Sequence, residues 1–267
     1  MNFGPILFAT FHSPGKIMLR TPRLSDKHIQ IFNQDGFLIL RQAFNIEEME
    51  SLVSWSDEML ARPEVSGKHW VYHEQSITDD TLVNRIENIA PFHLGFRELT
   101  KVLALPVGQL LNEKAVLFKE KINFKIPGGG GFKAHQDSQA GWEIYADFFI
   151  NVLVSIDAAT PENGCLELSA GYHKQRLLRL WEPLTESDMQ DIKFIPIHTE
   201  PGDIVFFDSY TPHQSAPNLS NHMRRIYYAT YNRRSAGEHM AKYYADKHKN
   251  FPPDIDREPN KNYVYQV

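Results

Sequence analysis

From about residue 115 onward, the sequence consists of short segments rich in β-branched and aromatic residues, separated by turns of Gly, Pro and Asn. Several segments alternate apolar and polar residues with a period of two, as strands with one buried face do. The run 147–157 is almost continuously apolar; its Phe, Ile and Val content favours a doubly covered strand over the alternative, a buried helix. Predicted strands lie at 115–126, 132–136, 146–157, 165–168, 193–199, 203–207 and 223–232. Many short strands joined by turns favour a sandwich or barrel.

The part of the chain before residue 114 has a different pattern. Apolar residues recur there at helical spacing, and Gly36 and Pro63 end two of the resulting segments. Predicted helices lie at 24–35, 46–62, 98–113 and, in the tail, 238–248, with one short buried strand at 37–40.

We expect the 267 residues to form one domain, 1–267. The helix-rich part, 1–113, serves better as a buttress of a single barrel at 114–232 than as an independent unit, and 233–267 is a C-terminal tail. A chain of this length buries enough surface to fold without disulfides or a structural metal.

The composition excludes several classes of protein. The chain has 28 Lys and Arg against 33 Asp and Glu, a formal net charge of −5 and 42% hydrophobic residues. An acidic chain lacks the basic face that neutralises the phosphates of duplex nucleic acid, so no nucleic-acid partner is expected. No stretch approaches the roughly 20 apolar residues of a membrane span, and the N-terminus lacks the basic start of a signal peptide. Because the single Cys165 precludes an internal disulfide, we expect a cytoplasmic protein that is not bound to a membrane.

The sequence His135-Gln136-Asp137 is the densest candidate for chemistry. It follows four glycines on a predicted strand, where residues two apart point to the same face. An imidazole and a carboxylate would then lie side by side, which is two thirds of the 2-His-1-carboxylate set that holds non-haem Fe(II) with open positions. His213 follows the apolar strand 203–207 after a short turn. It is the candidate third ligand, since two such rims meet when a sheet closes into a barrel.

A structural role is the alternative for these residues. An H-x-D triplet occurs often by chance, and a lone histidine beside an apolar strand is more commonly a hydrogen-bonded core residue than a ligand. Arg224 adds weight to the metal hypothesis, because it lies 11 residues after His213 at the start of an apolar strand. A guanidinium at that position can bind a carboxylate bidentately.

Taken together, the motifs resemble those of the phytanoyl-CoA dioxygenase family of Fe(II)- and 2-oxoglutarate-dependent oxygenases. They occur in the family's order over about 115–232, and Asp35-Gly36-Phe37 is similar to the family's usual N-terminal opening. The matching pieces are His135-Gln136-Asp137, Asn163-Gly164-Cys165-Leu166, Gly171-Tyr172-His173-Lys174, Gly202-Asp203, His213-Gln214-Ser215-Ala216-Pro217-Asn218, Arg224 and the tail Phe251-Pro252-Pro253-Asp254. One departure is the turn at 169–173, where the family prefers Pro-Gly-Ser-His; it lies away from the candidate ligands.

The resemblance implies a mainly β fold with flanking helices, built on a double-stranded β-helix (jelly-roll, cupin-like) core. It implies that His135, Asp137 and His213 bind Fe(II) and serve catalysis. The implied reaction consumes O2 and 2-oxoglutarate, yields succinate and CO2, and hydroxylates a C–H bond of a substrate.

The same resemblance implies contacts to 2-oxoglutarate. Arg224 would bind the far carboxylate of this co-substrate, with Ser215 assisting. Arg225 is the alternative if the register is shifted by one, because neighbouring strand residues face opposite ways. Asn123 and Gln136 are further candidates for co-substrate contacts.

Substrate-binding residues are expected on the strand that leads to Asn123. Alternation places Lys119 and Lys121 on the same face as Asn123, where inward-pointing charge is costly unless it meets an anion. The alternative is an edge strand with solvated lysines. Trp142 would line the mouth of the barrel, as an aromatic residue does in related ectoine-hydroxylating enzymes, or pack in the core. Other candidate anion contacts are Arg85, Arg233 and Arg234.

Basic residues near a small-molecule site, without coenzyme A features, favour a small anionic or zwitterionic substrate. The whole chain, including residues 85–93, is similar in texture to bacterial enzymes that hydroxylate 2-aminoethylphosphonate or its N-methylated analogues beside the phosphonate group, in phosphonate catabolism. The alternatives are a hydroxylase of another metabolite, such as an ectoine-like amino acid or an acyl-CoA, and a barrel that binds a ligand without oxidising it.

Two other motifs are weaker candidates. His69 and His73 have the spacing of a helical zinc site, but the metalloprotease pattern requires Glu after the first His and the sequence has Trp70. The four glycines 128–131 lack the Lys and Ser or Thr of a phosphate-binding loop and precede a strand. We expect them to form a turn at the mouth of the barrel.

Overall fold

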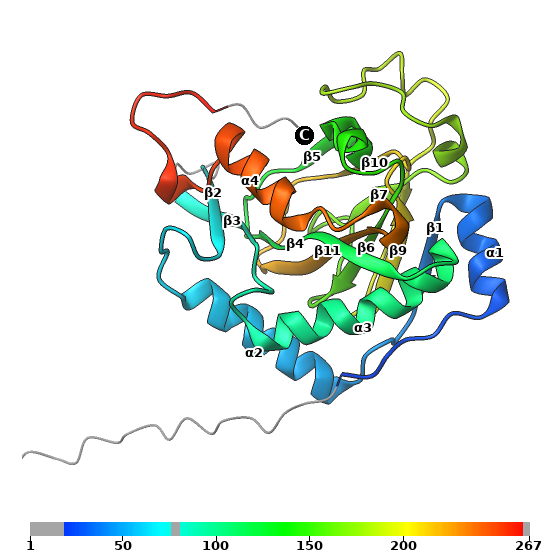
Figure 1. Ribbon diagram of the computed structural model, residues 1–267, viewed down its shortest axis with the longest axis horizontal. Coiled ribbons are helices and arrows are strands. Elements are labelled where there is room, and N and C mark those ends of the chain that lie inside the picture. Colours follow the sequence, from blue (N-terminus) through cyan, green and yellow to red (C-terminus); the bar gives the residue numbers. More distant parts are fainter. Residues whose placement is uncertain (1–18, 76–80, 264–267) are drawn as a thin grey trace, which may run out of the picture.

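The computed structural model describes residues 19–75 and 81–263, in which two antiparallel sheets form the body of the molecule (Figure 1). The N-terminal segment used above to argue against a signal peptide lies outside these residues. The larger sheet has the order β1 (Phe37–Leu40), β9 (Ile204–Asp208), β6 (Phe149–Ser155), β11 (Arg224–Arg233), β4 (Ala115–Lys125), β3 (Thr81–Glu87) and β2 (Trp70–Gln75). The smaller sheet has the order β5 (Phe132–His135), β10 (His213–Ser215), β7 (Leu166–Leu168) and β8 (Ile195–Pro196).

Helices flank the sheets. Ser25 and Asn45 cap the first two helices by accepting hydrogen bonds from backbone N–H groups of their first turns. The α-helices are α1 (Asp26–Asp35), α2 (Ile46–Ala61), α3 (Leu94–Leu111) and α4 (Met240–Asn250); short 3-10 turns are η1 (Asp137–Ala140), η2 (Trp142–Ile144), η3 (Tyr172–Gln175), η4 (Arg234–Ala236) and η5 (Asp254–Asp256). Over 19–75 and 81–263, none of the helices has the length and hydropathy needed to cross a membrane. The predicted mainly β fold with flanking helices is confirmed.

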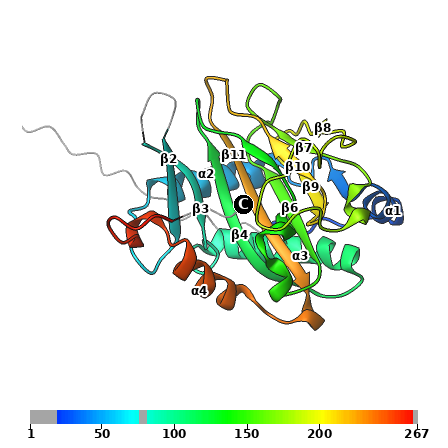
Figure 2. The same cartoon turned by 90° about the horizontal axis from the view of Figure 1, so that it is seen from above.

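The main hydrophobic core lies between α2, α3 and the larger sheet. Figures 1 and 2 show α3 running along β4, β6 and β11, and α4 beside β3 and β4. The ring of Phe96 on α3 stacks on that of Tyr227 on β11, with centroids 5.3 Å apart. The hydroxyl of Tyr231 donates to the Thr100 carbonyl at 2.8 Å. These buried contacts hold β11, and with it Arg224 at its start, against a rigid layer.

The predicted strands all have counterparts in the structure, but three observed strands were missed. Strands β2 and β3 lie within 1–113, so the description of that part as helix-rich was incomplete. Both belong to the larger sheet, where β3 pairs with β4 and β2 pairs with β3 at the edge. Their apolar pattern is interrupted by charged residues such as Glu74, Arg85 and Glu87. Strand β10 has only three residues, too few for a periodic signal.

Candidate active site

The two histidines and the aspartate of the sequence motif come together where β5 and β10 pair. His213 lies directly across from His135 in the strand register, with ring centroids 4.1 Å apart. Asp137 follows β5 at the start of η1. Its carboxylate oxygens lie 4.0 Å from His135 Nε2 and 3.7 Å from His213 Nε2. One ligand atom from each residue lies within 4.8 Å of the others, a spacing able to hold a metal ion.

Local backbone contacts orient both imidazole rings. His135 Nδ1 donates to the Lys133 carbonyl at 2.6 Å, and His213 Nδ1 donates to the Thr211 carbonyl at 2.9 Å. Because a carbonyl only accepts, each Nδ1 carries a proton, and each Nε2 lies toward Asp137. Burial and the neighbouring His213 lower the pKa of His135 to about 3, which keeps its ring neutral. Two imidazoles and one carboxylate on one side of an open space are the donor set that suits Fe(II).

A cavity of about 460 Å³ lies between the two sheets and contains this group at its wall. The larger sheet contributes residues of β3, β4 and β11, and the smaller sheet contributes residues of β5, β7 and β10. The charged and polar residues that line it include His73, Glu74, Asn84, Arg85, Lys119, Glu120, Lys121, Asn123, Lys133, His135, Asp137, Asn151, His213, Gln214, Ser215, Arg224 and Thr230. This volume lies toward the lower end of the range for pockets that bind small molecules.

Two buried cations lie side by side, and one of them, Arg224, lines the cavity. Arg224 on β11 is paired in register with Lys125 on β4. Arg224 is 1% exposed, donates to the Gly164 carbonyl through Nη1, and its Nε has no hydrogen-bond partner among the residues described. Lys125 Nζ donates to Ser215 Oγ at 2.9 Å and to the Ala216 carbonyl at 2.6 Å. Burial and the charge of Arg224 lower the pKa of Lys125 to about 7, and an anion bound beside it would favour its protonated form.

Lys125 was not identified from the sequence, although a signal was present. Residues 119, 121, 123 and 125 all share one face of β4, so the alternation that identified Lys119 and Lys121 extends to it.

Arg225 lies outside this site. Its guanidinium makes ion pairs with Asp157 at 2.7 Å and Asp57 at 2.6 Å, and its backbone N–H also donates to Asp157. Since Arg224 lines the cavity and Arg225 is paired elsewhere, only Arg224 is placed to meet a carboxylate in the cavity.

The two remaining co-substrate candidates have different surroundings. Asn123 lines the cavity, and its Oδ1 has no hydrogen-bond partner within the described part of the chain. Gln136 is fully buried and is not among the lining residues. Its amide donates to the carbonyls of Arg176 and Tyr210 and accepts from the Leu178 N–H, so it fastens neighbouring loops behind the metal-binding group.

Three of the candidate substrate contacts form a cationic wall, which we define as Arg85, Lys119 and Lys121. All three line the cavity. Lys119 Nζ lies 4.0 Å from the centre of the Trp142 ring, and Lys121 Nζ lies 5.5 Å from that of Tyr228. Burial and the charge of Lys119 lower the pKa of Lys121 to about 8. The lysines are therefore inward-pointing rather than solvated on an edge strand.

The other candidates do not line the cavity. Trp142 is 2% exposed and packs edge-on against Phe118 and Phe149, supporting Lys119 from behind. Arg233 lies at the far end of β11, over the ring of Phe148. Arg234 lies in η4, beyond the end of β11, and pairs with Glu238.

The two weaker motifs, His69 with His73 and the four glycines, lie in contacts that support the fold. His73 lies on β2 and His69 just before it, so their spacing falls on an extended segment and not on a helix; His73 pairs with Asp254 and Glu64. In the described ranges, the metal-binding group found is His135, Asp137 and His213. The glycines 128–131 connect β4 to β5; a Cβ on Gly131 would lie 2.4 Å from the Ser215 carbonyl oxygen, so that turn packs closely on β10.

Known proteins resemble this chain over most of its length. The family model described as "Phytanoyl-CoA dioxygenase (PhyH)" matches residues 32–226. A 2-aminoethylphosphonate dioxygenase from the uncultured bacterium HF130_AEPn_1 is 37% identical over 87% of this chain and 90% of its own length. A methylphosphonate hydroxylase from Gimesia maris is 38% identical over 85% of this chain and 88% of its own.

Solved structures share the fold. The crystal structure of EctD from S. alaskensis with 2-oxoglutarate and 5-hydroxyectoine superposes with a TM-score of 0.69 at 21% identity, covering 80% of this chain and 77% of that one. The predicted jelly-roll core is thus confirmed. The alternative of a barrel without catalytic activity is set aside by the match to a family of dioxygenases. The chain belongs to the phytanoyl-CoA dioxygenase (PhyH) family and is an oxygenase that depends on Fe(II) and 2-oxoglutarate.

Proposed function

We propose that this enzyme hydroxylates a small phosphonate, 2-aminoethylphosphonate or an N-methylated analogue, at the carbon next to phosphorus, as a step of phosphonate catabolism. The observation that carries the proposal is the cationic wall, which lines the same cavity as the metal-binding group. Buried cations are costly unless an anion compensates them. Two relatives of similar identity carry names of phosphonate-oxidising enzymes, which supports the same substrate class.

In this proposal two anions, 2-oxoglutarate and the phosphonate, bind to different parts of the cavity. His135, Asp137 and His213 hold Fe(II), which supplies the oxidising chemistry when O2 and 2-oxoglutarate are present. Arg224, with Lys125 and Ser215 beside it, binds the far carboxylate of 2-oxoglutarate through charge-assisted hydrogen bonds. The cationic wall binds the phosphonate oxygens, so that the adjacent carbon faces the metal-binding group.

Substrate turnover tests the proposal directly. The iron-loaded enzyme is incubated with O2, 2-oxoglutarate and, in separate reactions, 2-aminoethylphosphonate, its N-methylated analogues, methylphosphonate and ectoine. We expect succinate release coupled to a phosphonate and a new hydroxyphosphonate signal in the phosphorus NMR spectrum. Absence of both with every phosphonate would refute the proposal, and coupling to ectoine alone would favour the other metabolite class.

A substitution in the cationic wall tests whether the wall binds the phosphonate. Lys121→Met removes one charge-assisted contact, worth about 1.5–3 kcal/mol, so the KM for the phosphonate should rise about tenfold to hundredfold. The KM for 2-oxoglutarate should stay near that of the wild type. Lys101→Met is the matched control, because Lys101 is exposed on α3 and pairs with Glu98. An unchanged phosphonate KM in Lys121→Met would contradict the role of the wall.

A further inference from the structure

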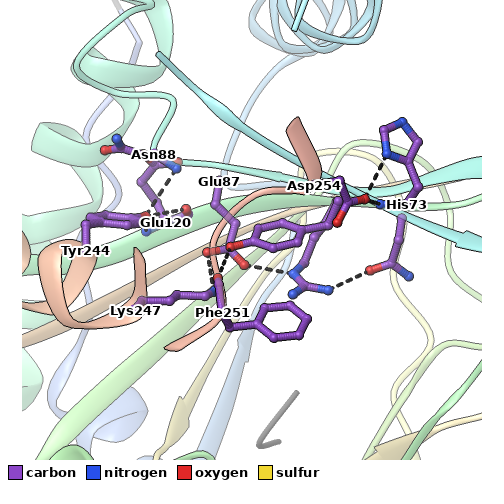
Figure 3. Close-up of polar contacts among 11 residues, drawn as sticks. His73, Glu87, Asn88, Glu120, Tyr244, Lys247, Phe251 and Asp254 are labelled. Atoms are coloured by element: carbon purple, nitrogen blue, oxygen red, sulfur yellow. Dashed lines mark hydrogen bonds and ion pairs between the residues drawn. The ribbon is translucent and has the colours of Figure 1, made fainter. Parts of the chain in front are cut away.

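The segment that follows the barrel packs on β2 and β3 beside the cavity (Figure 3). The hydroxyl of Tyr72 donates to the Phe251 carbonyl at 2.9 Å, and the His73 N–H donates to Asp254 at 2.7 Å. On α4, the hydroxyl of Tyr244 donates to the Glu120 carbonyl at 3.1 Å. Contacts from three successive parts of the segment fix α4 against the larger sheet.

The same helix inserts one lysine into the buried charges of β3. Lys247 Nζ lies 2.5 Å from Glu87 Oε2, and the two side chains are only 12% and 4% exposed. The other oxygen of Glu87 accepts from Arg85 Nε at 2.8 Å. Although burial acts to raise the pKa of Glu87, the charges of Lys247 and Arg85 outweigh it and hold the pKa well below its usual range. One carboxylate is thus shared between a cavity-lining arginine and a lysine of the C-terminal helix.

These contacts fix the orientation of the Arg85 guanidinium. Its Nε edge is bound by Glu87, its Nη1 donates to Asn84 Oδ1 at 3.0 Å, and its plane lies 4.2 Å from the centre of the Tyr72 ring. Figure 3 shows the contact between Glu87 and Lys247, and the other oxygen of Glu87 is bound by Arg85. A guanidinium held on its edge and on its face has a fixed orientation.

The negative charge of Glu87 would oppose anion binding if Lys247 did not neutralise it. A buried carboxylate next to the cationic wall would repel a bound anion and offset the charge of Arg85. Lys247 neutralises it, so the wall keeps a net positive charge toward the cavity. Burial of Lys247, opposed by Glu87 and reinforced by the nearby Arg85 and Lys119, lowers its pKa to about 7. An anion in the cavity would favour the protonated form of this lysine.

We infer that Lys247 is a positioning residue for anion recognition: through Glu87 it holds Arg85 toward the cavity and cancels the negative charge that would oppose a bound phosphonate. This inference rests on the proposed function and deepens it. It assigns to the C-terminal helix a part in substrate affinity, although Lys247 itself touches Glu87 and not the reacting atoms.

The experiment compares four proteins: the wild type, Lys247→Met, the double variant Glu87→Gln/Lys247→Met, and Lys242→Met as control. Lys242 lies on the same helix, but it is 58% exposed and pairs with Asp246. Affinity for 2-aminoethylphosphonate is measured by anaerobic calorimetry with Fe(II) and 2-oxoglutarate present, and KM and kcat are measured under air.

Lys247→Met should weaken phosphonate binding and raise its KM about tenfold or more, because it leaves the Glu87 charge uncompensated. The value of kcat and the KM for 2-oxoglutarate should change less than about twofold, a split that a general loss of structure would not give. The double variant should recover most of the affinity, since its glutamine can still accept from Arg85 Nε and no buried charge is left alone. Lys242→Met should behave as the wild type.

Several outcomes overturn the inference. Equal phosphonate affinity in Lys247→Met and the wild type removes the role of Lys247. A double variant as weak as a correctly folded Lys247→Met shows that charge cancellation is not the cause. If Lys247→Met does not fold, the double variant decides alone, because near-wild-type affinity supports the charge argument and a tenfold loss rejects it. If the wild type itself neither binds nor oxidises a phosphonate, the proposed function fails, and this inference fails with it.

Discussion

The two ends of the cavity are built in different ways. At the metal-binding end, each histidine ring is oriented by a carbonyl two residues earlier, and the two histidines meet on paired strands. At the cationic end, Arg85 is oriented by Glu87, and Glu87 is bound by Lys247, which is 160 residues away in the chain. The orientation of each histidine ring at the metal-binding end is therefore encoded locally, although His135 and His213 meet only where β5 and β10 pair. The cationic end exists only once distant elements have packed.

The largest effect is expected at the metal-binding end. Asp137→Ala or His135→Ala removes a metal ligand, so bound iron and substrate-dependent succinate formation should both be lost. Iron content after anaerobic loading and succinate release are the measurements. His222→Ala, which removes an exposed histidine outside the cavity lining, is the control. Wild-type turnover in either ligand variant would show that the metal-binding end has been misassigned.

A smaller effect should separate the two neighbouring arginines. Arg224→Lys keeps the charge but loses the planar donor pair, so the KM for 2-oxoglutarate should rise about 10- to 100-fold, equivalent to roughly 1.4–3 kcal/mol. Arg225→Lys should leave that KM unchanged, because Arg225 pairs with Asp57 and Asp157. Steady-state kinetics with 2-oxoglutarate varied at fixed substrate gives the answer. If Arg225→Lys raised this KM and Arg224→Lys did not, 2-oxoglutarate would have to bind on the other face of β11.

The last expected effect is on stability and not on catalysis, and it concerns Glu120, a buried carboxyl on β4 that lies between the two lysines of the wall in the sequence. Its Oε1 accepts from the N–H groups of Ile89 and Ala90, yet burial outweighs these bonds and raises its pKa to about 8 from an ordinary value of 4.5. Because the folded-state pKa is the higher one, the stabilising contribution is complete below about pH 4.5 and is lost as the pH rises through 8.

As the pH rises from 5.5 to 8.5, the free energy of unfolding of the wild type should therefore fall by about 2–4 kcal/mol more than that of Glu120→Gln. This estimate uses roughly 1.4 kcal/mol for each unit of pH between the two pKa values. Urea unfolding at several pH values measures the difference between the two profiles. Glu50→Gln, an exposed change on α2, should leave the profile of the wild type unaltered. Parallel profiles for Glu120→Gln and the wild type would show that Glu120 is ionised throughout this range.

Periodicity predicted much of the fold and part of the site. The long strands β4, β6 and β11 are visible because their burial alternates or is continuous over many residues. Strands β2 and β3 were missed because charged side chains such as Glu74 and Arg85 interrupt the apolar pattern that identifies a strand. The charged residues that interrupt the apolar pattern of these strands are therefore among the residues that line the cavity.

Alternation also explains which site residues were found. Lys119, Lys121 and Asn123 share a face of β4, and the structure turns that face into the cavity. Trp142 and Gln136 are buried behind the cavity, a distinction that depends on the path of the loops around them. No spacing rule places Lys247 near Glu87, because they belong to elements that meet only in the folded chain.

By itself, the sequence determined the candidate iron ligands, the strand-rich core and the expectation of an anionic substrate, because each depends on residue types and on the order of motifs along the chain, which resembles that of a known family. Tertiary structure decided which of Arg224 and Arg225 faces the cavity, which basic residues form its wall and which lysine compensates Glu87. The physical reason is that a strand's period of two says only that neighbours face opposite ways. Which face becomes the inside depends on what packs against it.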